Sequence, residues 1–319
     1  MRHEVTLVPG DCPGLFQHVR PVIAATGAEL VFDEPGANPT LEGLLASARR
    51  TGTVLMGYEH GRRDQGELAP VVRLREQLGV FCNLRPIRNI AGIPSMAEGV
   101  DLLIVRETTE DIYAHLEHES IPGVFESLKV TTRAACERIA HHAFQVARQY
   151  GRKRVTVVHK ANIMKLSDGM FLRTALKVAE SYPDLEVDEV IVDALCMKLI
   201  LNPERFDVLL TGNLFGDIVS DLCTGLVGGT SNAPSINTAP DCTLFTAGHR
   251  VKAEEAEANP LTLLVPLERL LLHLGEDAAA ARLHGALERT LTSGVKPSAI
   301  GGSTDGRAFC NAVVQAMGA

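Results

Sequence analysis

Two aspartates, Asp217 and Asp221, lie four residues apart in the segment NLFGDIVSDL, which has the apolar pattern of a helix. A spacing of four places both carboxylates on one helical face, where they repel each other unless water or a cation lies between them. Carboxylate oxygens are the ligands that Mg²⁺ and Mn²⁺ prefer, and Asp193, after a predicted strand, could complete such a site. The alternative for Asp217 is a residue at the helix start, favoured there by the helix dipole.

Three arginines, Arg75, Arg85 and Arg106, precede this candidate metal site. Because the forked guanidinium matches a planar carboxylate, they predict a polycarboxylate or phosphate ligand, although each could instead form a surface or structural ion pair. Two further residues could move protons. Tyr113 lies just beyond Arg106, and Lys160 ends a predicted buried strand, where a lysine beside a metal ion can act as a base.

The elements that position these residues alternate between short β-rich runs and longer helical stretches, which predicts an α/β fold. Strands are expected at residues 4–9, 52–57, 102–107, 154–160, 189–196 and 206–212, and helices at 131–150, 217–227, 260–273 and after Asp277. In open α/β sheets, ligands bind beyond the carboxyl ends of the strands. Polar residues at those ends, namely Arg106, Lys160, Asp193 and Asn213, therefore predict one polar site, although each alone could merely solvate a loop.

Composition narrows the class of protein. A chain of 319 residues predicts two lobes or one large α/β unit, and its net charge of −8 disfavours nucleic acid as a partner. No apolar run approaches the roughly 20 residues that span a bilayer, and the segment MRHEVTLVPGD lacks the apolar region of a secretion signal, so we expect a cytoplasmic protein. Seven cysteines without a C-x-x-C pair predict buried free thiols rather than zinc or disulfides.

Four longer motifs add a family resemblance. The segments LREQLGVFCNLRPI, IVRETTEDIYAHLEHESIPGVFESLKVTT, VVHKANIMKLSDGMF and NLFGDIVSDLCTGLVGG resemble the β-decarboxylating dehydrogenases, the family of isocitrate, homoisocitrate and 3-isopropylmalate dehydrogenases. The likeness is strong over residues 72–236 and is nearest the NAD-dependent isocitrate and homoisocitrate branch. It implies a two-lobed α/β/α sandwich that is not an ordinary Rossmann fold. Residues 1–80 with 228–319 would form the larger, cofactor-side lobe, and residues 81–227 a central lobe with the dimer contact and the metal site.

The resemblance also implies roles for the residues that bind substrate and move protons. Arg75, Arg85 and Arg106 fall on the arginines that clamp the substrate carboxylates. Tyr113 falls on the general acid that protonates the enolate carbon after CO₂ leaves. Lys160 falls on the base near the substrate hydroxyl, which in this family comes from the neighbouring subunit.

Metal and cofactor positions follow from the same likeness. Asp217 and Asp221 fall on ligands of Mg²⁺ or Mn²⁺ from one chain, Asp193 falls on the ligand from the partner, and Asn162 falls near the nicotinamide. The active site of the family spans a dimer interface, so a homodimer or larger assembly is implied. The implied reaction is metal-dependent oxidation and decarboxylation of a small polycarboxylate, a 3-substituted malate-type 2-hydroxy acid.

Three segments depart from the family pattern. Isocitrate enzymes offer a Ser and an Asn to the distal carboxylate where this chain has Ala69 and Val71, and an apolar wall does not offset the desolvation of a carboxylate. A substrate other than isocitrate is therefore predicted. The adenosine-binding loop is shortened over residues 247–260, although His249 and Asn259 still match.

The shortened loop bears on the cofactor. Glu254, with Glu255 and Glu257, lies near the position that reads the ribose, and carboxylates repel a 2′-phosphate, so NAD is predicted over NADP. The N-terminal cofactor segment departs as well, reading Gly10-Asp11-Cys12-Pro13-Gly14-Leu15-Phe16 without the acidic residue that ends the family motif. These changes leave an alternative, a non-catalytic or regulatory subunit that keeps the fold and the carboxylate clamp.

Overall fold

The computed structural model describes residues 1–8, 10, 13–34, 40–57, 70–229, 233–247 and 259–318. The chain divides into two compact units. The terminal unit contains Met1–Gly79, Asn89–Met96 and Val227–Ala319, and the central unit contains Val80–Arg88 and Ala97–Leu226. Every candidate residue except Arg75, His249, Glu254 and Asn259 belongs to the central unit.

One segment departs from the expected boundaries. Residues 89–96, which the sequence places in the central lobe, belong to the terminal unit. The amide of Ala91 donates to Glu288 Oε1 over 3.4 Å, and Ile90 and Ile93 are buried. Gly92, at φ +88°, lies so close to Leu291 that a Cβ atom there would stand 2.6 Å from the Leu291 carbonyl carbon. These contacts anchor the segment to a C-terminal helix.

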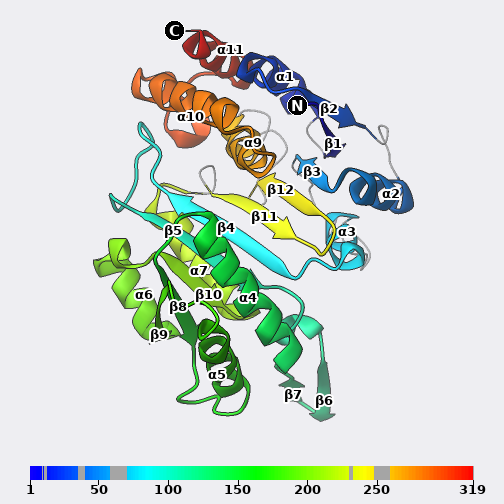
Figure 1. Ribbon diagram of the computed structural model, residues 1–319, viewed down its shortest axis with the longest axis vertical. Helices are drawn as coiled ribbons and strands as arrows, with labels where there is room; N and C mark the ends of the chain where they lie inside the picture. Colours follow the sequence, from blue (N-terminus) through cyan, green and yellow to red (C-terminus); the bar gives the residue numbers. More distant parts are fainter. Residues whose placement is uncertain are drawn as a thin grey trace. The chain divides into compact units, whose positions relative to one another are not determined.

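The terminal unit has strands in the order β2-β1-β3-β12-β11, parallel except for the β11–β12 pair. The strands are β1 His3–Val8, β2 Leu30–Asp33, β3 Thr53–Met56, β11 Pro234–Thr238 and β12 Thr243–Ala247. The helices are α1 Pro13–Thr26, α2 Leu41–Thr51, α3 Pro70–Leu78, α9 Leu261–His273, α10 Asp277–Thr292 and α11 Gly306–Met317. Helices α1 and α11, from opposite ends of the chain, lie side by side (Figure 1). Helix α9 is buried on all sides, as its nearly continuous apolar sequence predicts.

The central unit has strands in the order β4-β5-β10-β8-β9, with β4 antiparallel to β5 and the others parallel. The strands are β4 Cys82–Arg88, β5 Asp101–Glu107, β8 Arg154–His159, β9 Glu186–Ile191 and β10 Val208–Thr211. Apolar runs such as Leu102–Val105 are fully buried, as expected for strands covered on both faces. A separate hairpin, β6 Glu117–Ile121 with β7 Val124–Ser127, is exposed along its whole length.

Four helices complete the three layers of this unit: α4 Arg133–Gln149, α5 Ser167–Ala179, α6 Val192–Leu201 and α7 Asn213–Leu226. Helices α4 and α5 pack together on one face of the sheet, and α6 and α7 pack together on the other (Figure 1). The predicted helix at 131–150 is present as α4, and the Thr132 hydroxyl caps it by accepting from the Ala135 amide at 3.2 Å.

Two predicted boundaries are wrong. Residues 192–196, expected to continue a strand, form the first turns of α6, so Asp193 lies on a helix. Helix α7 begins at Asn213 rather than at Asp217. Asp217 is therefore in the second turn of α7, which removes the interpretation of this residue as a helix-start carboxylate.

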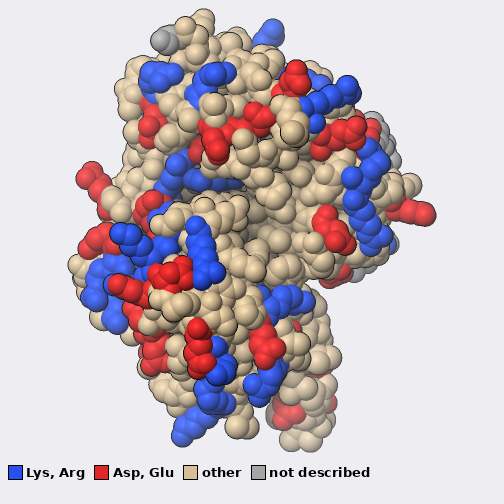
Figure 2. Space-filling model, in the orientation of Figure 1, with Lys and Arg blue, Asp and Glu red and all other residues tan. Residues whose placement is uncertain are grey.

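The charged surface and the cysteines correspond to what the composition predicts. Acidic and basic side chains are interspersed over the face drawn in Figure 2. Within the described ranges, no helix has both the length and the apolar character needed to cross a bilayer. The six cysteines that the structure describes are free thiols, and all except Cys196 are buried.

Candidate active site

Arg106, the sixth residue of β5, points onto the start of α7. Its Nε and Nη2 atoms donate to Asn213 Oδ1 over 3.0 and 2.7 Å, and its Nη1 atom forms an ion pair with Asp217 Oδ1. The strand fixes one end of this contact and the i,i+4 spacing of α7 fixes the other. The guanidinium is therefore held against the first two turns of the helix, with the Arg106 side chain 14% exposed.

Gly216 permits this approach. A Cβ atom at position 216 would stand 2.5 Å from Arg106 Cγ and 2.4 Å from Thr211 Oγ1, both far inside van der Waals contact. Only glycine lets the stem of Arg106 cross α7 at this point. Sequence reasoning missed Gly216, because the signal is a close contact between segments more than a hundred residues apart.

Tyr113 lies on the other side of the same aspartate. A 3₁₀ turn, Ile112–Ala114, carries this residue, and its hydroxyl donates to Asp217 Oδ2 over 2.6 Å. The Arg106 guanidinium lies 5.2 Å from the centre of the tyrosine ring. Burial, followed by the hydrogen bond to Asp217, raises the pKa of Tyr113 to about 12. The phenol thus stays protonated at neutral pH and can serve as a proton donor.

Arg85 lies on the same sheet face as Arg106. In the antiparallel β4–β5 pair, Asn83 is opposite Arg106 and Arg85 is opposite Ile104, so the two arginines are diagonal neighbours. Arg85 is almost completely buried. Two of the three predicted clamp arginines are therefore brought together. Arg75 lies on α3 of the terminal unit.

Lys160 follows β8 and forms a second ionic cluster. Its Nζ atom donates to Oδ1 of Asp193, in the first turn of α6, over 2.7 Å. This hydrogen bond lowers the pKa of Asp193 below its ordinary value. The predicted base and one predicted metal ligand are thus paired within a chain.

The predicted metal ligands do not form one cage in a single chain. Asp217 and Asp221 lie one turn apart on α7, and both reach solvent. Among the residues that the structure describes, no three His, Cys, Asp or Glu side chains are grouped to hold a metal ion. The predicted ligands on α7, Asp217 and Asp221, offer hard carboxylate oxygens, which suit Mg²⁺ or Mn²⁺ if another chain supplies the third carboxylate.

Of the four predicted cofactor residues, the structure describes Asn162 and Asn259. Asn162 is exposed in the turn after Lys160. Asn259 is buried at the start of α9, where its carbonyl oxygen accepts from the Thr262 hydroxyl over 2.8 Å. His249, Glu254 and Ala69 lie outside the described residues, and the side chain of Val71 does as well.

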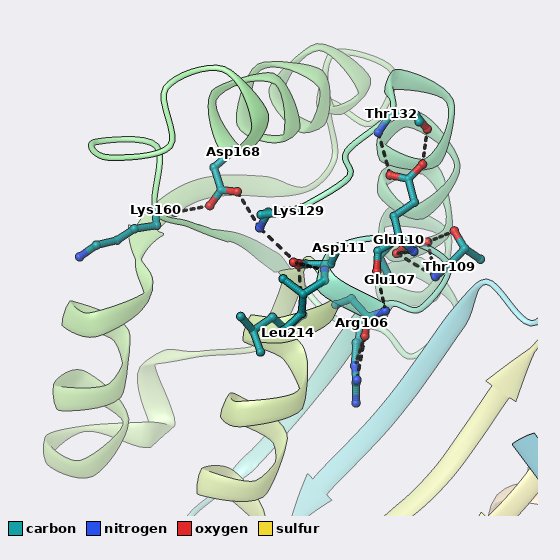
Figure 3. A network of polar contacts seen from close by, with 12 residues as sticks. Arg106, Glu107, Thr109, Glu110, Asp111, Lys129, Thr132, Lys160, Asp168 and Leu214 are labelled. Atoms are coloured by element: carbon teal, nitrogen blue, oxygen red, sulfur yellow. Dashed lines mark hydrogen bonds and ion pairs between the residues drawn. The ribbon is translucent and has the colours of Figure 1, made fainter. Parts of the chain in front are cut away.

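A buried ionic network behind the site was not predicted (Figure 3). The ammonium of Lys129 pairs with Asp168 Oδ1 over 2.9 Å and with Asp111 Oδ2 over 3.3 Å. A cavity of about 30 Å³, room for about one water molecule, adjoins all three side chains. Each residue looks like an ordinary surface charge in the sequence. Only their burial in the folded chain shows that they form a unit.

Comparison with known proteins finds relatives that match nearly the whole chain. The family described as isocitrate/isopropylmalate dehydrogenase matches residues 31–317. Among curated relatives from Arabidopsis thaliana, regulatory subunit 2 and catalytic subunit 5 of mitochondrial NAD isocitrate dehydrogenase are each 38% identical. These matches cover 97% of this chain and 88% and 87% of the two relatives. The crystal structure of isocitrate dehydrogenase from Methylococcus capsulatus is 35% identical, with a TM-score of 0.89 over 99% of both chains. The predicted resemblance and fold class are confirmed.

Proposed function

Because this chain belongs to the isocitrate/isopropylmalate dehydrogenase family, a family of decarboxylating dehydrogenases, we propose that it oxidises and decarboxylates a 3-substituted malate. The observation that carries the proposal is the convergence of Arg106 and Tyr113 on the two oxygens of Asp217. An anion-binding cation, a protonated phenol and a metal-ligating carboxylate in contact are the parts that such a reaction needs.

The chemistry assigns one task to each side chain. Arg85 and Arg106 bind the substrate carboxylates and orient the hydroxyl-bearing carbon toward the nicotinamide. Lys160 accepts the hydroxyl proton as hydride leaves that carbon. After CO₂ departs, Tyr113 donates its proton to the enolate carbon. Asp217 and Asp221, with Asp193 of the partner subunit, would hold Mg²⁺ or Mn²⁺, which supplies Lewis-acid stabilisation of the negative charge on oxygen.

We propose further that the working enzyme is a homodimer or larger, with each site built from two chains. The pairing of Asp193 with Lys160, away from the carboxylates of α7, supports this arrangement. Large apolar side chains are also exposed on the β6–β7 hairpin and on helices α6 and α7, including Ile121, Phe125, Met197, Leu201 and Ile218. Apolar surface of this kind favours a protein partner over solvent.

For the cofactor we propose NAD⁺ rather than NADP⁺. The glutamates at 254, 255 and 257 in the adenosine segment would repel a 2′-phosphate. The two Arabidopsis thaliana relatives described above are named as NAD isocitrate dehydrogenase subunits, which supports the same choice.

A second candidate is a non-catalytic regulatory subunit. The observation that favours it is that relatives named as regulatory and as catalytic subunits are equally similar, at 38% identity. The altered N-terminal and adenosine segments point the same way. Against it stands the retention of Tyr113, Lys160 and the carboxylate pair on α7.

One screen separates these candidates. Purified protein is incubated with Mg²⁺ and NAD⁺ or NADP⁺ against isocitrate and malates with other 3-substituents, while the absorbance of reduced cofactor is followed. We expect metal-dependent reduction of NAD⁺, with isocitrate weaker than a malate whose substituent suits Ala69 and Val71. Binding of substrate or dinucleotide without turnover would favour the regulatory subunit, and isocitrate as the best substrate would contradict the pocket argument.

A further inference from the structure

We infer that Lys129 is a positioning residue that fixes the turn carrying Tyr113 and the loop carrying Lys160 to one another inside the central unit. Lys129 lies between β7 and α4. Its ion pairs within the described chain are with Asp111 and Asp168 and not with Tyr113 or Lys160. Its action would pass through two buried carboxylates, Asp111 and Asp168. The effect of Lys129 on a reaction rests on the proposed function. The positioning of the two segments rests on the contacts of Lys129, Asp111 and Asp168.

Lys129 is held by three contacts. Its ammonium lies 2.9 Å from Asp168 Oδ1, 3.3 Å from Asp111 Oδ2 and 4.9 Å from the centre of the Phe215 ring. The lysine side chain is 17% exposed, and those of Asp111 and Asp168 are only 4% and 5% exposed. Two carboxylates this deeply buried need a counter-ion, and among the described residues the ion pairs of both are with Lys129.

Asp111 connects this lysine to the acid. Its Oδ1 atom accepts from the amide of Ile112 over 2.9 Å and caps the 3₁₀ turn of Tyr113, while its Oδ2 atom accepts from the amide of Leu214 over 3.1 Å. Its backbone has φ +77°, a region that residues other than glycine rarely occupy. Strain of this kind persists only where surrounding contacts hold it, and here the side-chain bonds of Asp111 hold both Tyr113 and the start of α7.

Asp168 connects the same lysine to the base. Its Oδ2 atom accepts from the backbone amide of Lys160 over 2.7 Å. Figure 3 shows the Lys160 side chain extending away from Asp168, so the bond anchors the backbone and leaves the ammonium to Asp193. Lys129 thus joins two supports, one under Tyr113 and one under Lys160. In the proposed dimer, Tyr113 and Lys160 of one chain serve different active sites. Each Lys129 would therefore support the acid of one site and the base of the other.

The test is Lys129→Met in the full-length protein, with Lys177→Met as the matched control. Lys177 is an exposed lysine on α5 whose ion pair, among the residues that the structure describes, is with Glu180. Hydrogen exchange followed by mass spectrometry reports on peptides that contain Ile112, Leu214 and Lys160. We expect faster exchange in these peptides of Lys129→Met, no change in the α9 peptides of the terminal unit, and no change anywhere in Lys177→Met.

Kinetics provide the second measurement. A misplaced acid and base predict a kcat lower by about 10- to 100-fold with KM changed much less. Lys129→Arg, which keeps the charge, should recover part of the loss. A uniform rise in exchange over both units, or a kcat loss that Lys129→Arg does not relieve at all, would show that Lys129 only stabilises the fold and would overturn the inference.

If Lys129→Met does not fold, Asp168→Asn replaces it. The carboxamide keeps the size of the side chain and weakens the bond to the Lys160 amide, so exchange should rise at Lys160 and stay unchanged at Ile112. Equal effects at the Ile112 and Lys160 amides, or no effect at either, would overturn the inference that Asp111 holds the Tyr113 turn and Asp168 holds the Lys160 loop. The exchange measurements need no substrate. If the unaltered protein shows no turnover, the proposed function fails while the positioning role is still decided.

Discussion

The two oxygens of Asp217 have different partners: Oδ1 pairs with the Arg106 guanidinium and Oδ2 accepts from the Tyr113 hydroxyl. One carboxylate therefore links the Arg106 guanidinium to the Tyr113 phenol, the proposed anion-binding group and the proposed proton donor. A metal ion that binds Asp217 must compete with both neighbours. In the proposed reaction, metal binding, release of the phenol and availability of Arg106 for a substrate carboxylate would thus be coupled through a single side chain.

The first prediction concerns the pKa of Tyr113. Burial and the hydrogen bond to Asp217 raise this pKa from 10.0 to about 12. The stabilisation that the phenol gives the folded state is therefore complete below pH 10 and is lost as the pH rises through about 12.

The chain has four tyrosines and no tryptophan. Ultraviolet titration of metal-free protein, minus that of Tyr113→Phe, should show one tyrosine ionising near pH 12. Asp217→Asn should lower that pKa only partly, because burial is the larger cause; a difference titration centred on pH 10 would contradict the assignment.

The second prediction concerns Gly216. Gly216→Ala places a methyl group against Arg106 and Thr211, and overpacking of this kind costs about 1–3 kcal/mol of folding free energy. Because Arg106 must move, KM for the substrate should rise as well.

Gly225 on the same helix is the matched control, since a Cβ atom there would meet nothing within 4 Å. Gly225→Ala should stabilise α7 by about 0.5–1 kcal/mol and leave KM unchanged. Urea unfolding and steady-state kinetics measure both effects. Equal behaviour of the two alanine variants would remove the proposed role of Gly216.

The third prediction concerns the metal. Chelator should abolish activity and Mg²⁺ or Mn²⁺ should restore it. Asp217→Asn removes a ligand charge, and we expect Mn²⁺ affinity to fall by at least the roughly 10- to 100-fold loss that is common for outer-shell changes. Titration calorimetry measures this change, and Asp184→Asn, which alters an exposed ion pair with Arg148, is the control. Unchanged Mn²⁺ affinity in Asp217→Asn would remove this residue from the metal site.

Local pattern predicted much of the central unit. The apolar spacing of α4 and the β-rich runs of β5, β8 and β10 correspond to the described elements, because helix and strand periodicity is written in neighbouring residues. The i,i+4 spacing of Asp217 and Asp221 similarly places both on one face of α7. Arg106 and Tyr113 were both singled out and do meet, at Asp217.

Contacts between distant segments could not be predicted from such patterns. The importance of Gly216 comes from the close approach of the Arg106 side chain. That of Lys129 comes from its ion pairs with the buried carboxylates of Asp111 and Asp168. No periodicity marks these relationships, since the partners lie far apart in the sequence or on separate elements. The boundary between β9 and α6 was missed for another reason. The apolar residues 190–192 fit a strand or a helix equally well, and packing decides between them.

The last prediction tests whether each active site uses two chains. Tyr113→Phe and Lys160→Met should each abolish turnover on their own. When the two variants are unfolded together and refolded as a mixture, a mixed dimer contains one site with both substitutions and one site with neither, provided that Lys160 serves the partner's site. Random pairing makes half of the dimers mixed, so about one quarter of the unaltered activity should return. If Lys160 instead served the site of its own chain, every site in the mixture would carry one substitution and no activity would return. Refolding each variant alone is the control, because a recovery that does not require mixing cannot come from a shared site.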